Sequence, residues 1–203
     1  FINTLDGVAL WPDEHGCVSV DRGVGMISQS GNVGINLTMQ QRNLRMAYMV
    51  TVGNQAGGGI EDVLETFIHD DRVTAIGMFI EAIRDAPRFA ALAQEAFARN
   101  KRIVALQTGK SEAGALIAAS HTASLAGNRQ AYAAFFDRCG VATVETPTEL
   151  LETLKLLDNG GPLSGYRIAS LSCSGGEASL VADLSEATNL VFAPFPDEQR
   201  ARI

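Results

Sequence analysis

The sequence predicts an α/β protein built around a doubly wound parallel β-sheet. Short apolar segments alternate with longer segments of helical periodicity, which is the pattern of repeated strand and helix units. Hydrophobic residues make up 46% of the chain but aromatic residues only 6%, and 20 glycines allow helices to approach a sheet closely. Glycine and serine gather where the apolar segments end, as expected of turns that join parallel strands to helices.

The expected strands are five short apolar segments, each followed by a helical pattern. The strands are predicted at residues 23–28, 46–52, 73–80, 102–107 and 141–144. The helices are predicted at residues 35–44, 60–69, 86–100, 128–139 and 146–157. The last helix opens with Thr146 as its cap and Pro147 at its first position. Because continuous apolar strands are typical of parallel sheets covered on both faces, right-handed crossovers are expected between them.

Composition divides the chain into four parts. Residues 1–21 show little periodicity and are predicted to be an N-terminal arm or linker. Residues 22–158 hold the five strand and helix units and form the first domain. Residues 159–165, which contain glycine and proline, are predicted to be a second linker. Residues 166–203 are predicted to be the truncated first part of a second domain of the same kind.

Charge and cysteine usage argue against several classes of partner. The formal net charge is −7 and the sequence pI is near 4.9, so binding to nucleic acid or to an anionic membrane is not expected. No apolar run reaches the ~20 residues of a membrane span. Cys17, Cys139 and Cys173 are widely spaced and odd in number, which argues against a disulfide framework or a zinc site. A reducing, cytoplasmic location is therefore expected.

Two turns have the composition of an anion site. Ser28-Gln29-Ser30-Gly31 joins the first strand to a helix, and Ser174-Gly175-Gly176 repeats this layout between a strand predicted at 167–172 and a helix predicted at 178–187. Backbone N–H groups and the positive dipole end of a helix start favour bound anions. The alternative is ordinary turn chemistry, in which serine caps the helix. Neither turn has the spacing of a dinucleotide motif or a nucleotide P-loop.

Residues 108–127 form a long predicted loop that carries one imidazole. His121 lies between Ser120 and Thr122 among small residues, as an accessible nucleophile or proton carrier requires. Glu81 follows the third strand, at the end where open α/β sheets place ligand-contacting groups. A carboxylate there would hold one nitrogen of the histidine and fix its tautomer. The alternatives are an unreactive loop histidine and a solvated loop acid.

Six short motifs occur together in one order along the chain. They are Ser28-Gln-Ser-Gly31, Val52-Gly-Asn54, Phe79-Ile-Glu81, Thr108-Gly-Lys110, Ser120-His-Thr122 with Ser124-Leu-Ala-Gly127, and Ser174-Gly-Gly176. In this order, over roughly residues 8–195, the chain resembles the NDP-forming acyl-CoA synthetases, the superfamily of ADP-forming acetyl-CoA synthetase and succinyl-CoA synthetase. The resemblance implies that residues 22–158 are a flavodoxin-like domain that carries a phosphohistidine, followed by the start of a second flavodoxin-like domain.

The resemblance also implies a role for each candidate residue. His121 would be phosphorylated during turnover, and Glu81 would orient it. The residues expected to bind phosphate are Ser28, Gln29, Ser30, Gly31, Ser174, Gly175 and Gly176. Those expected in a loop on the substrate or CoA side are Gly53, Asn54, Ser120 and Thr122. Family members usually have glycine where this sequence has Ala123, a departure that would alter how closely the backbone approaches the phosphate.

The implied reaction is acid + CoA + ATP ⇌ acyl-CoA + ADP + phosphate, through an acyl phosphate and a phosphohistidine. ATP or ADP and CoA are substrates, Mg²⁺ accompanies the nucleotide, and no metal site is expected in this chain. A CoA-binding domain and an ATP-grasp domain, on the same or a partner chain, would complete the enzyme, so this fragment is not expected to turn over alone. A homo-oligomer is also expected.

Two other functions stay open at this point. A regulatory or acyltransferase relative would use the same scaffold as a sensor of acyl-CoA or nucleotide, although a sensor has no need of His121. A flavodoxin-like module that binds FMN or a small phosphate ligand would leave the histidine loop without a role. The sequence does not identify the acid, nor does it distinguish ADP from GDP.

Overall fold

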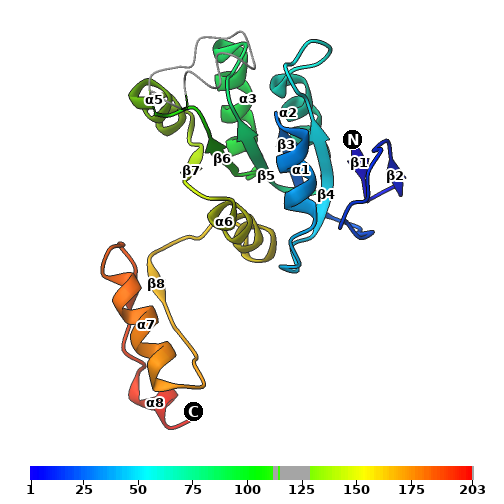
Figure 1. Cartoon of the computed structure of the whole chain (residues 1–203). Coiled ribbons are helices and arrows are strands. Elements are labelled where there is room, and N and C mark those ends of the chain that lie inside the picture. Colours follow the sequence, from blue (N-terminus) through cyan, green and yellow to red (C-terminus); the bar gives the residue numbers. More distant parts are fainter. Residues whose placement is uncertain (112–113, 115–128, 203) are drawn as a thin grey trace. The chain divides into compact units, whose positions relative to one another are not determined.

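The computed structural model describes residues 1–111, 114 and 129–202 (Figure 1). The chain divides into two compact units, Phe1–Pro162 and Leu163–Ile203. The division falls within residues 159–165, the segment that the sequence predicts to be a linker. The larger unit contains a seven-stranded sheet, and the smaller unit contains one pair of strands.

The sheet of the larger unit has the strand order β2-β1-β4-β3-β5-β6-β7. The strands are β1 (Ile2–Asn3), β2 (Val8–Ala9), β3 (Gly23–Ser28), β4 (Met46–Thr51), β5 (Val73–Ile80), β6 (Ile103–Gln107) and β7 (Ala142–Val144). From β4 to β7 all neighbouring strands are parallel. Counted along the chain, these five strands have the flavodoxin-like order 2-1-3-4-5. The predicted α/β fold with a doubly wound parallel sheet is therefore confirmed.

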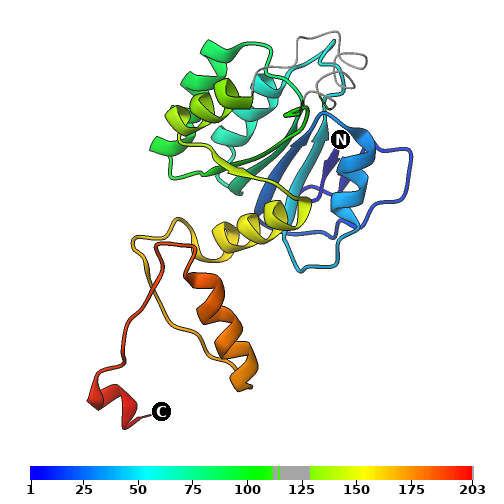
Figure 2. The same cartoon turned by 60° about the vertical axis from the view of Figure 1, so that its left-hand side comes forward.

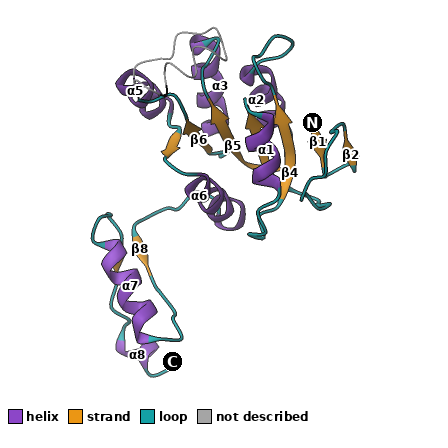
Figure 3. Cartoon of the chain, viewed as in Figure 1, coloured by secondary structure: helices purple, strands orange, loops and turns teal. Residues whose placement is uncertain are grey.

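Helices cover both faces of this sheet (Figures 2 and 3). They are α1 (Gly31–Thr38), α2 (Ile60–His69), α3 (Ala86–Ala98), α5 (Arg129–Cys139) and α6 (Pro147–Gly160). On one face α2, α3 and α5 bury Phe67, Phe89 and Phe136 against the strands. On the other face α1 and α6 bury Leu37 and Leu154. Because each fully buried side chain of this size contributes ~1.5–3 kcal/mol, the two layers hold the sheet rigidly between them.

Local signals in the sequence set where these helices begin and end. Ser30, Asp85 and Thr146 cap α1, α3 and α6, and each side chain accepts a hydrogen bond from a backbone N–H three residues later. Pro147 occupies the first turn of α6, as predicted. Gly140 has a φ of +68°, a left-handed conformation that ends α5 at little cost only for glycine.

The N-terminal segment differs from its prediction as an arm or linker. Strands β1 and β2 pair with each other in antiparallel fashion, and β1 extends the sheet beside β4. Ile2 is buried in the core, and the Thr4 hydroxyl donates to the carbonyl of Met46 at 2.7 Å. Strands of two residues are too short to produce a period in the sequence, so only tertiary pairing shows that this segment belongs to the larger unit.

The smaller unit repeats the strand and helix layout with far less packing. It contains β8 (Arg167–Ile168), α7 (Gly175–Ser185), β9 (Val191–Phe192) and α8 (Asp197–Arg200). β8 and β9 pair in parallel over two residues, so the strand expected at 167–172 is much shorter than predicted. A strand extends only as far as a partner continues its ladder, and the described residues offer β8 no second partner.

Candidate functional site

The candidate site lies where the chain leaves β3 at the centre of the sheet. β4 flanks β3 on one side and β5 on the other, so the connections from these strands diverge beyond their carboxyl ends. The N–H of Val52 donates to the Ser28 carbonyl at 2.9 Å, and the N–H of Gln29 donates to the Phe79 carbonyl at 3.0 Å. This point is the topological switch point of the sheet, where open α/β folds place their ligands.

The start of α1 faces this switch point. The Ser30 side chain accepts from the N–H of Val33 at 3.3 Å and so caps the helix. The next two residues, Gly31 and Asn32, are exposed, and their N–H groups find no acceptor among the described residues. The first N–H groups of a helix have no partner within it, and they lie at its positive dipole end. The turn therefore has the chemistry of an anion site.

Ser28 and Gln29 do not contribute exposed groups to this turn. Ser28 is fully buried, and its hydroxyl donates to the Ser30 carbonyl at 2.7 Å. Gln29 is 6% exposed, and its side-chain oxygen accepts from the N–H groups of Glu81 and Ala82 at 2.5 and 2.9 Å. These side chains shape the turn from inside, whereas Ser30 and Gly31 lie at its surface.

Glu81 follows β5 at the same edge of the sheet. Glu81 is half-buried, and its carboxylate makes no hydrogen bond or ion pair to any residue within the described ranges. Its backbone is held firmly, because its N–H donates to the Gln29 side-chain oxygen and the preceding Ile80 carbonyl accepts from the N–H of Thr108. A fixed backbone with an unengaged carboxylate suits a group that orients another side chain.

The glycine-rich loop between β4 and α2 is also fixed at this edge. Gly53 has a φ of +52°, and the Asn54 side-chain oxygen accepts a hydrogen bond from the N–H of Ala56. Gly53 and Asn54 are both exposed. At the end of the loop, Asp62 accepts from the N–H of Gly59 at 2.8 Å, and Arg88 pairs with it at 2.6 Å. These two contacts hold the pKa of Asp62 below its usual range.

Sequence reasoning missed the residues that tie this loop to the end of β5. Gln55 is buried, and its amide nitrogen donates to the Ala82 carbonyl at 3.1 Å. Glu61 is 1% exposed and accepts from the N–H of Asp85 at 3.0 Å, while the Arg84 guanidinium donates to the Gln55 carbonyl at 2.8 Å. A large amide in a run of glycines was the only signal for Gln55, since its partners are distant in sequence.

The segment predicted to be the histidine loop, residues 108–127, begins beside this edge, and most of it lies outside the described residues. Lys110 follows β6, and its ammonium group pairs with both carboxylate oxygens of Glu145 at 3.0 Å. The predicted residues Ser120, His121 and Thr122, and the departure at Ala123, all lie outside the described residues. The structure therefore brings together Ser30, Gly31, Gly53, Asn54 and Glu81 at one edge, and the histidine stays a prediction.

The second predicted anion turn lies in the smaller unit. Ser174 caps α7 by accepting from the N–H of Glu177 at 3.2 Å, the same arrangement as at Ser30. Gly175 and Gly176 are exposed at the start of this helix. The Cys173 thiol donates to the Glu177 carboxylate at 3.3 Å. This turn thus offers the same kind of free helix start as the turn after β3.

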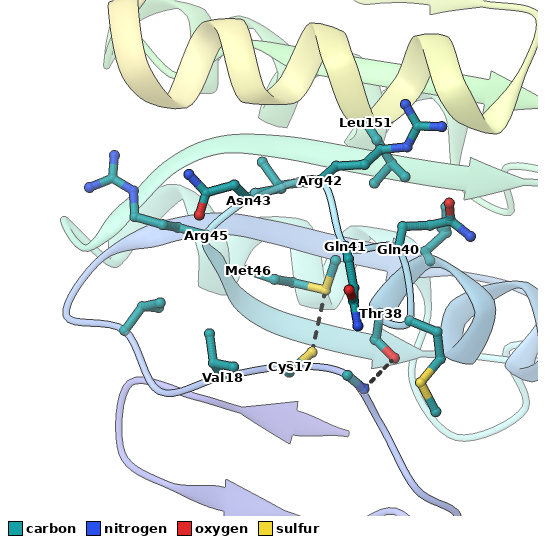
Figure 4. A pocket seen from close by; sticks show the side chains of 15 residues that line it. Cys17, Val18, Thr38, Gln40, Gln41, Arg42, Asn43, Arg45, Met46 and Leu151 are labelled. Carbon is teal, nitrogen blue, oxygen red and sulfur yellow. Dashed lines mark hydrogen bonds between the residues drawn. The ribbon is translucent and has the colours of Figure 1, made fainter.

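Other features of the described residues lie away from this chemistry. A cavity of about 380 Å³ opens at the far end of the strands, between the residues before β3 and the loop that joins α1 to β4 (Figure 4). Burial raises the pKa of the Cys17 thiol in its wall to about 11, so this cysteine is not a thiolate nucleophile near neutral pH. The described residues contain no cluster of metal-ligating side chains and no helix long and apolar enough to cross a membrane.

The strand order and the position of the turns define the class of this protein as a flavodoxin-like α/β protein. Residues 21–157 match the family model described as the succinyl-CoA ligase like flavodoxin domain, and the chain belongs to this family. The resemblance to the ADP-forming acyl-CoA synthetases is thereby confirmed.

Several relatives share this sequence and fold. The alpha subunit of acetate–CoA ligase (ADP-forming) II from Pyrococcus furiosus is 34% identical over 86% of this chain and 38% of its own length. Acetate–CoA ligase (ADP-forming) from Methanocaldococcus jannaschii is 32% identical over 85% of this chain and 25% of its own length. A dinucleotide-forming acetyl-coenzyme A synthetase 1 from Ca. Korarchaeum cryptofilum, solved in complex with phosphate and ADP, aligns with a TM-score of 0.76 and 27% identity over 87% of this chain and 39% of its own. The chain therefore spans well under half the length of these relatives.

Proposed function

We propose that this chain is the phosphohistidine-bearing part of an NDP-forming acyl-CoA synthetase, which interconverts acid, CoA and ATP with acyl-CoA, ADP and phosphate. In the direction of synthesis, a nitrogen of His121 takes the phosphoryl group of ATP and ADP leaves. The carboxylate of the acid then displaces the imidazole from phosphorus and becomes an acyl phosphate. The sulfur of CoA finally displaces phosphate from the acyl carbon.

The observation that carries this proposal is the meeting of Glu81 and the start of α1 at the switch point of a domain from this family. The carboxylate has no partner among the described residues, and the N–H groups of Gly31 and Asn32 have no acceptor there. A phosphohistidine needs both kinds of group: an acceptor for the second ring nitrogen and donors for the phosphoryl oxygens.

Each residue has a chemical task in this proposal. Glu81 accepts a hydrogen bond from one nitrogen of His121, which leaves the other nitrogen free to attack phosphorus. The N–H groups after Ser30 stabilise the oxygens of the transferred phosphoryl group. The turn at Ser174, Gly175 and Gly176 in the smaller unit has donors of the same kind.

The remaining candidate residues have supporting roles. The buried Ser28 and Gln29 shape the first turn rather than touching phosphate directly. The exposed Gly53 and Asn54, together with Ser120 and Thr122, border the substrate or CoA side of the site. Catalysis then depends mainly on positioning and on donors aimed at the transferring group, as in other phosphoryl transfers.

The proposal extends to parts of the enzyme beyond these residues. We infer that a CoA-binding domain and an ATP-grasp domain act with this chain, either fused to it or on a partner subunit, and that Mg²⁺ enters with the nucleotide. Support comes from the greater length of the relatives and from the phosphate and ADP in the related solved structure. We further infer a cytoplasmic location, since the three free cysteines suit a reducing compartment. A homo-oligomer is also part of this proposal.

The test is phosphorylation of the whole protein that contains this chain, together with any subunit that copurifies with it. Incubation with Mg²⁺ and ATP labelled on the γ-phosphate is expected to give acid-labile, base-stable label on the peptide that carries His121. The label is expected to be absent from a His121→Asn variant. Glu81→Gln should slow labelling by about 100-fold, the scale of a lost proton-transfer or orienting group.

Glu14→Gln is the matched control, because Glu14 is an exposed acid in the segment before β3. This variant should be labelled at the rate of the unmodified protein. Absence of label while nucleotide binding is intact would contradict the proposal and favour a sensor of acyl-CoA or nucleotide.

A further inference from the structure

Two buried glutamines meet at the end of β5. Gln29 belongs to the turn between β3 and α1, and Gln55 belongs to the glycine-rich loop between β4 and α2. Each residue is only 6% exposed, although neither lies in a strand or helix. We propose that these two residues, the glutamine clamp, position Glu81 for phosphoryl transfer, an inference that rests on the function proposed above.

The clamp holds the backbone of residues 81–82 from two sides. The Gln29 side-chain oxygen accepts from the N–H of Glu81 at 2.5 Å and from the N–H of Ala82 at 2.9 Å. The Gln55 side-chain nitrogen donates to the carbonyl of Ala82 at 3.1 Å. Backbone N–H groups only donate and carbonyls only accept, so the orientation of both amides is determined. Two side chains thus satisfy three backbone groups just beyond the last residue of β5.

Gln55 is itself fixed in an uncommon backbone conformation. Its φ is +62°, a left-handed value that costs a non-glycine residue of order 1 kcal/mol or more. Its side-chain oxygen accepts from the N–H of Ile60 at 3.0 Å, and its carbonyl accepts from Arg84 at 2.8 Å. The two atoms of one amide therefore join the start of α2 to the end of β5. Such a conformation persists only where surrounding contacts hold it in place.

The position from which the Glu81 side chain starts follows from this arrangement. The carboxylate has no partner of its own among the described residues, so the contacts that place Glu81 are those of the backbone at residues 81–82, which fix the direction of its Cα–Cβ bond. A displacement of 1 Å of a catalytic group can cost about 100-fold in rate. Gln29 and Gln55 are thus positioning residues that act through Glu81, and neither needs to touch the phosphoryl group.

The test measures the first-order rate of His121 phosphorylation in the whole protein with saturating ATP and Mg²⁺. Gln29→Met and Gln55→Met remove the amide at nearly constant volume. Each is expected to lower the rate by about 10- to 100-fold while the KM for ATP is unchanged. In a Glu81→Gln background, the same substitutions should lower the rate less than about twofold, because no carboxylate is left to position.

Thr74→Val is the matched structural control. It removes a 2.6 Å hydrogen bond from the Thr74 hydroxyl to Asp158 at the opposite end of β5. We expect it to lower the melting temperature about as much as the methionine variants while the phosphorylation rate is unchanged. If a methionine variant does not fold, Gln29→Asn, whose shorter amide reaches at most one of the two N–H groups, is expected to slow labelling by about 10-fold.

The possible outcomes separate the clamp from the proposed function. Methionine variants that are labelled at the normal rate, or that lose as much rate in the Glu81→Gln background as alone, would overturn the clamp while the proposed function stands. A Glu81→Gln variant with the normal rate would overturn both the role of Glu81 and the clamp. Absence of label in the unmodified protein would overturn the proposed function and the clamp together.

Discussion

The same local layout occurs in both units of the chain with very different packing. After β3 and after β8, a serine caps a helix by accepting from the N–H three residues later, at 3.3 Å for Ser30 and 3.2 Å for Ser174. All six residues of β3 are buried, whereas β8 has two residues and neither is buried. Helix α1 buries Gly34, Leu37 and Thr38, whereas α7 buries none of its residues.

This comparison separates what a short motif specifies from what packing supplies. The cap and the turn form in both units because they depend on residues that are adjacent in sequence. The long strand and the buried helix face form only in the larger unit, where neighbouring strands and a second helix layer are present. Leu171, at 99% exposure, shows how little of the smaller unit is covered by its own residues.

The largest expected effect comes from removing a core aromatic side chain. Phe136 is fully buried and packs against the rings of Phe89 and Tyr132, so Phe136→Ala should lower the free energy of unfolding of the larger unit by about 4 kcal/mol. Leu180→Ala in α7 of the smaller unit, where the side chain is 58% exposed, should change the free energy of unfolding of the larger unit by less than about 0.5 kcal/mol. The single tryptophan, Trp11, lies in the larger unit, and its fluorescence during urea unfolding measures the effect of each substitution on that unit. If the two substitutions changed the free energy of unfolding equally, the contrast in packing between the two units would be wrong.

A second contrast uses glycines of the two units. A Cβ at Gly25 in β3 would lie 2.5 Å from the ring of Phe67, which is itself buried and stacked on Tyr48, so Gly25→Val should destabilise the larger unit by about 3 kcal/mol. A Cβ at Gly176 in α7 would meet no atom within 4 Å. Gly176→Ala should leave the urea midpoint of Trp11 fluorescence unchanged, and a large shift there would show that α7 is packed more closely than the structure indicates.

A smaller effect is expected from a polar network found in the larger unit. Asp70 accepts hydrogen bonds from Arg72 at 2.9 Å and from Tyr48 at 2.6 Å. The hydrogen bond from Arg72 is the main reason that the pKa of Asp70 lies well below its usual range. Burial, together with the hydrogen bond to Asp70, raises the pKa of Tyr48 to about 12. Among the described residues of the smaller unit there is no ion pair.

The signs of these shifts predict a loss of stability at both ends of the pH range. The contribution of Asp70 is present above its unfolded pKa of about 3.9 and is lost as pH falls through its lowered folded pKa. The contribution of Tyr48 is present below about pH 10 and is lost as pH rises towards 12. Tyr48→Phe should cost about 1.5 kcal/mol at pH 7 and remove the part of the alkaline loss that Tyr48 contributes, as measured by urea unfolding from pH 7 to 11. The part contributed by the partly buried Cys17 thiol should stay. An unchanged alkaline profile would rule out this assignment.

The smallest expected effect concerns the two matching caps. Ser30→Ala should lower the free energy of unfolding of the larger unit by about 1 kcal/mol, because α1 is part of its packed core. Ser174→Ala should leave Trp11-detected unfolding unchanged and reduce hydrogen-exchange protection only within α7. A change in Trp11-detected unfolding with Ser174→Ala would mean that the two units unfold together.

Much of the fold and part of the candidate site followed from the sequence. The five parallel strands were predicted to within one residue at each end, because buried parallel strands appear as continuous apolar runs. The sequence predicted Glu81 and the turn at Ser30 to follow strand ends, and the structure has both at the same edge of the sheet. The roles of Gln29 and Gln55 were not, since both contact residues that lie 27 to 53 positions away in sequence.

The sequence by itself determined the features whose causes are local, which are the capped helix starts and the glycine that ends α5. It also identified the family of the chain, through motifs spread along its length. The tertiary structure alone decided that β1 and β2 join the sheet, that β8 stops after two residues, and that two glutamines hold the end of β5. The physical reason is the distance in sequence between the residues that interact. A cap or turn is satisfied by atoms a few residues away, whereas strand length and buried amide partners depend on segments that only the fold brings together.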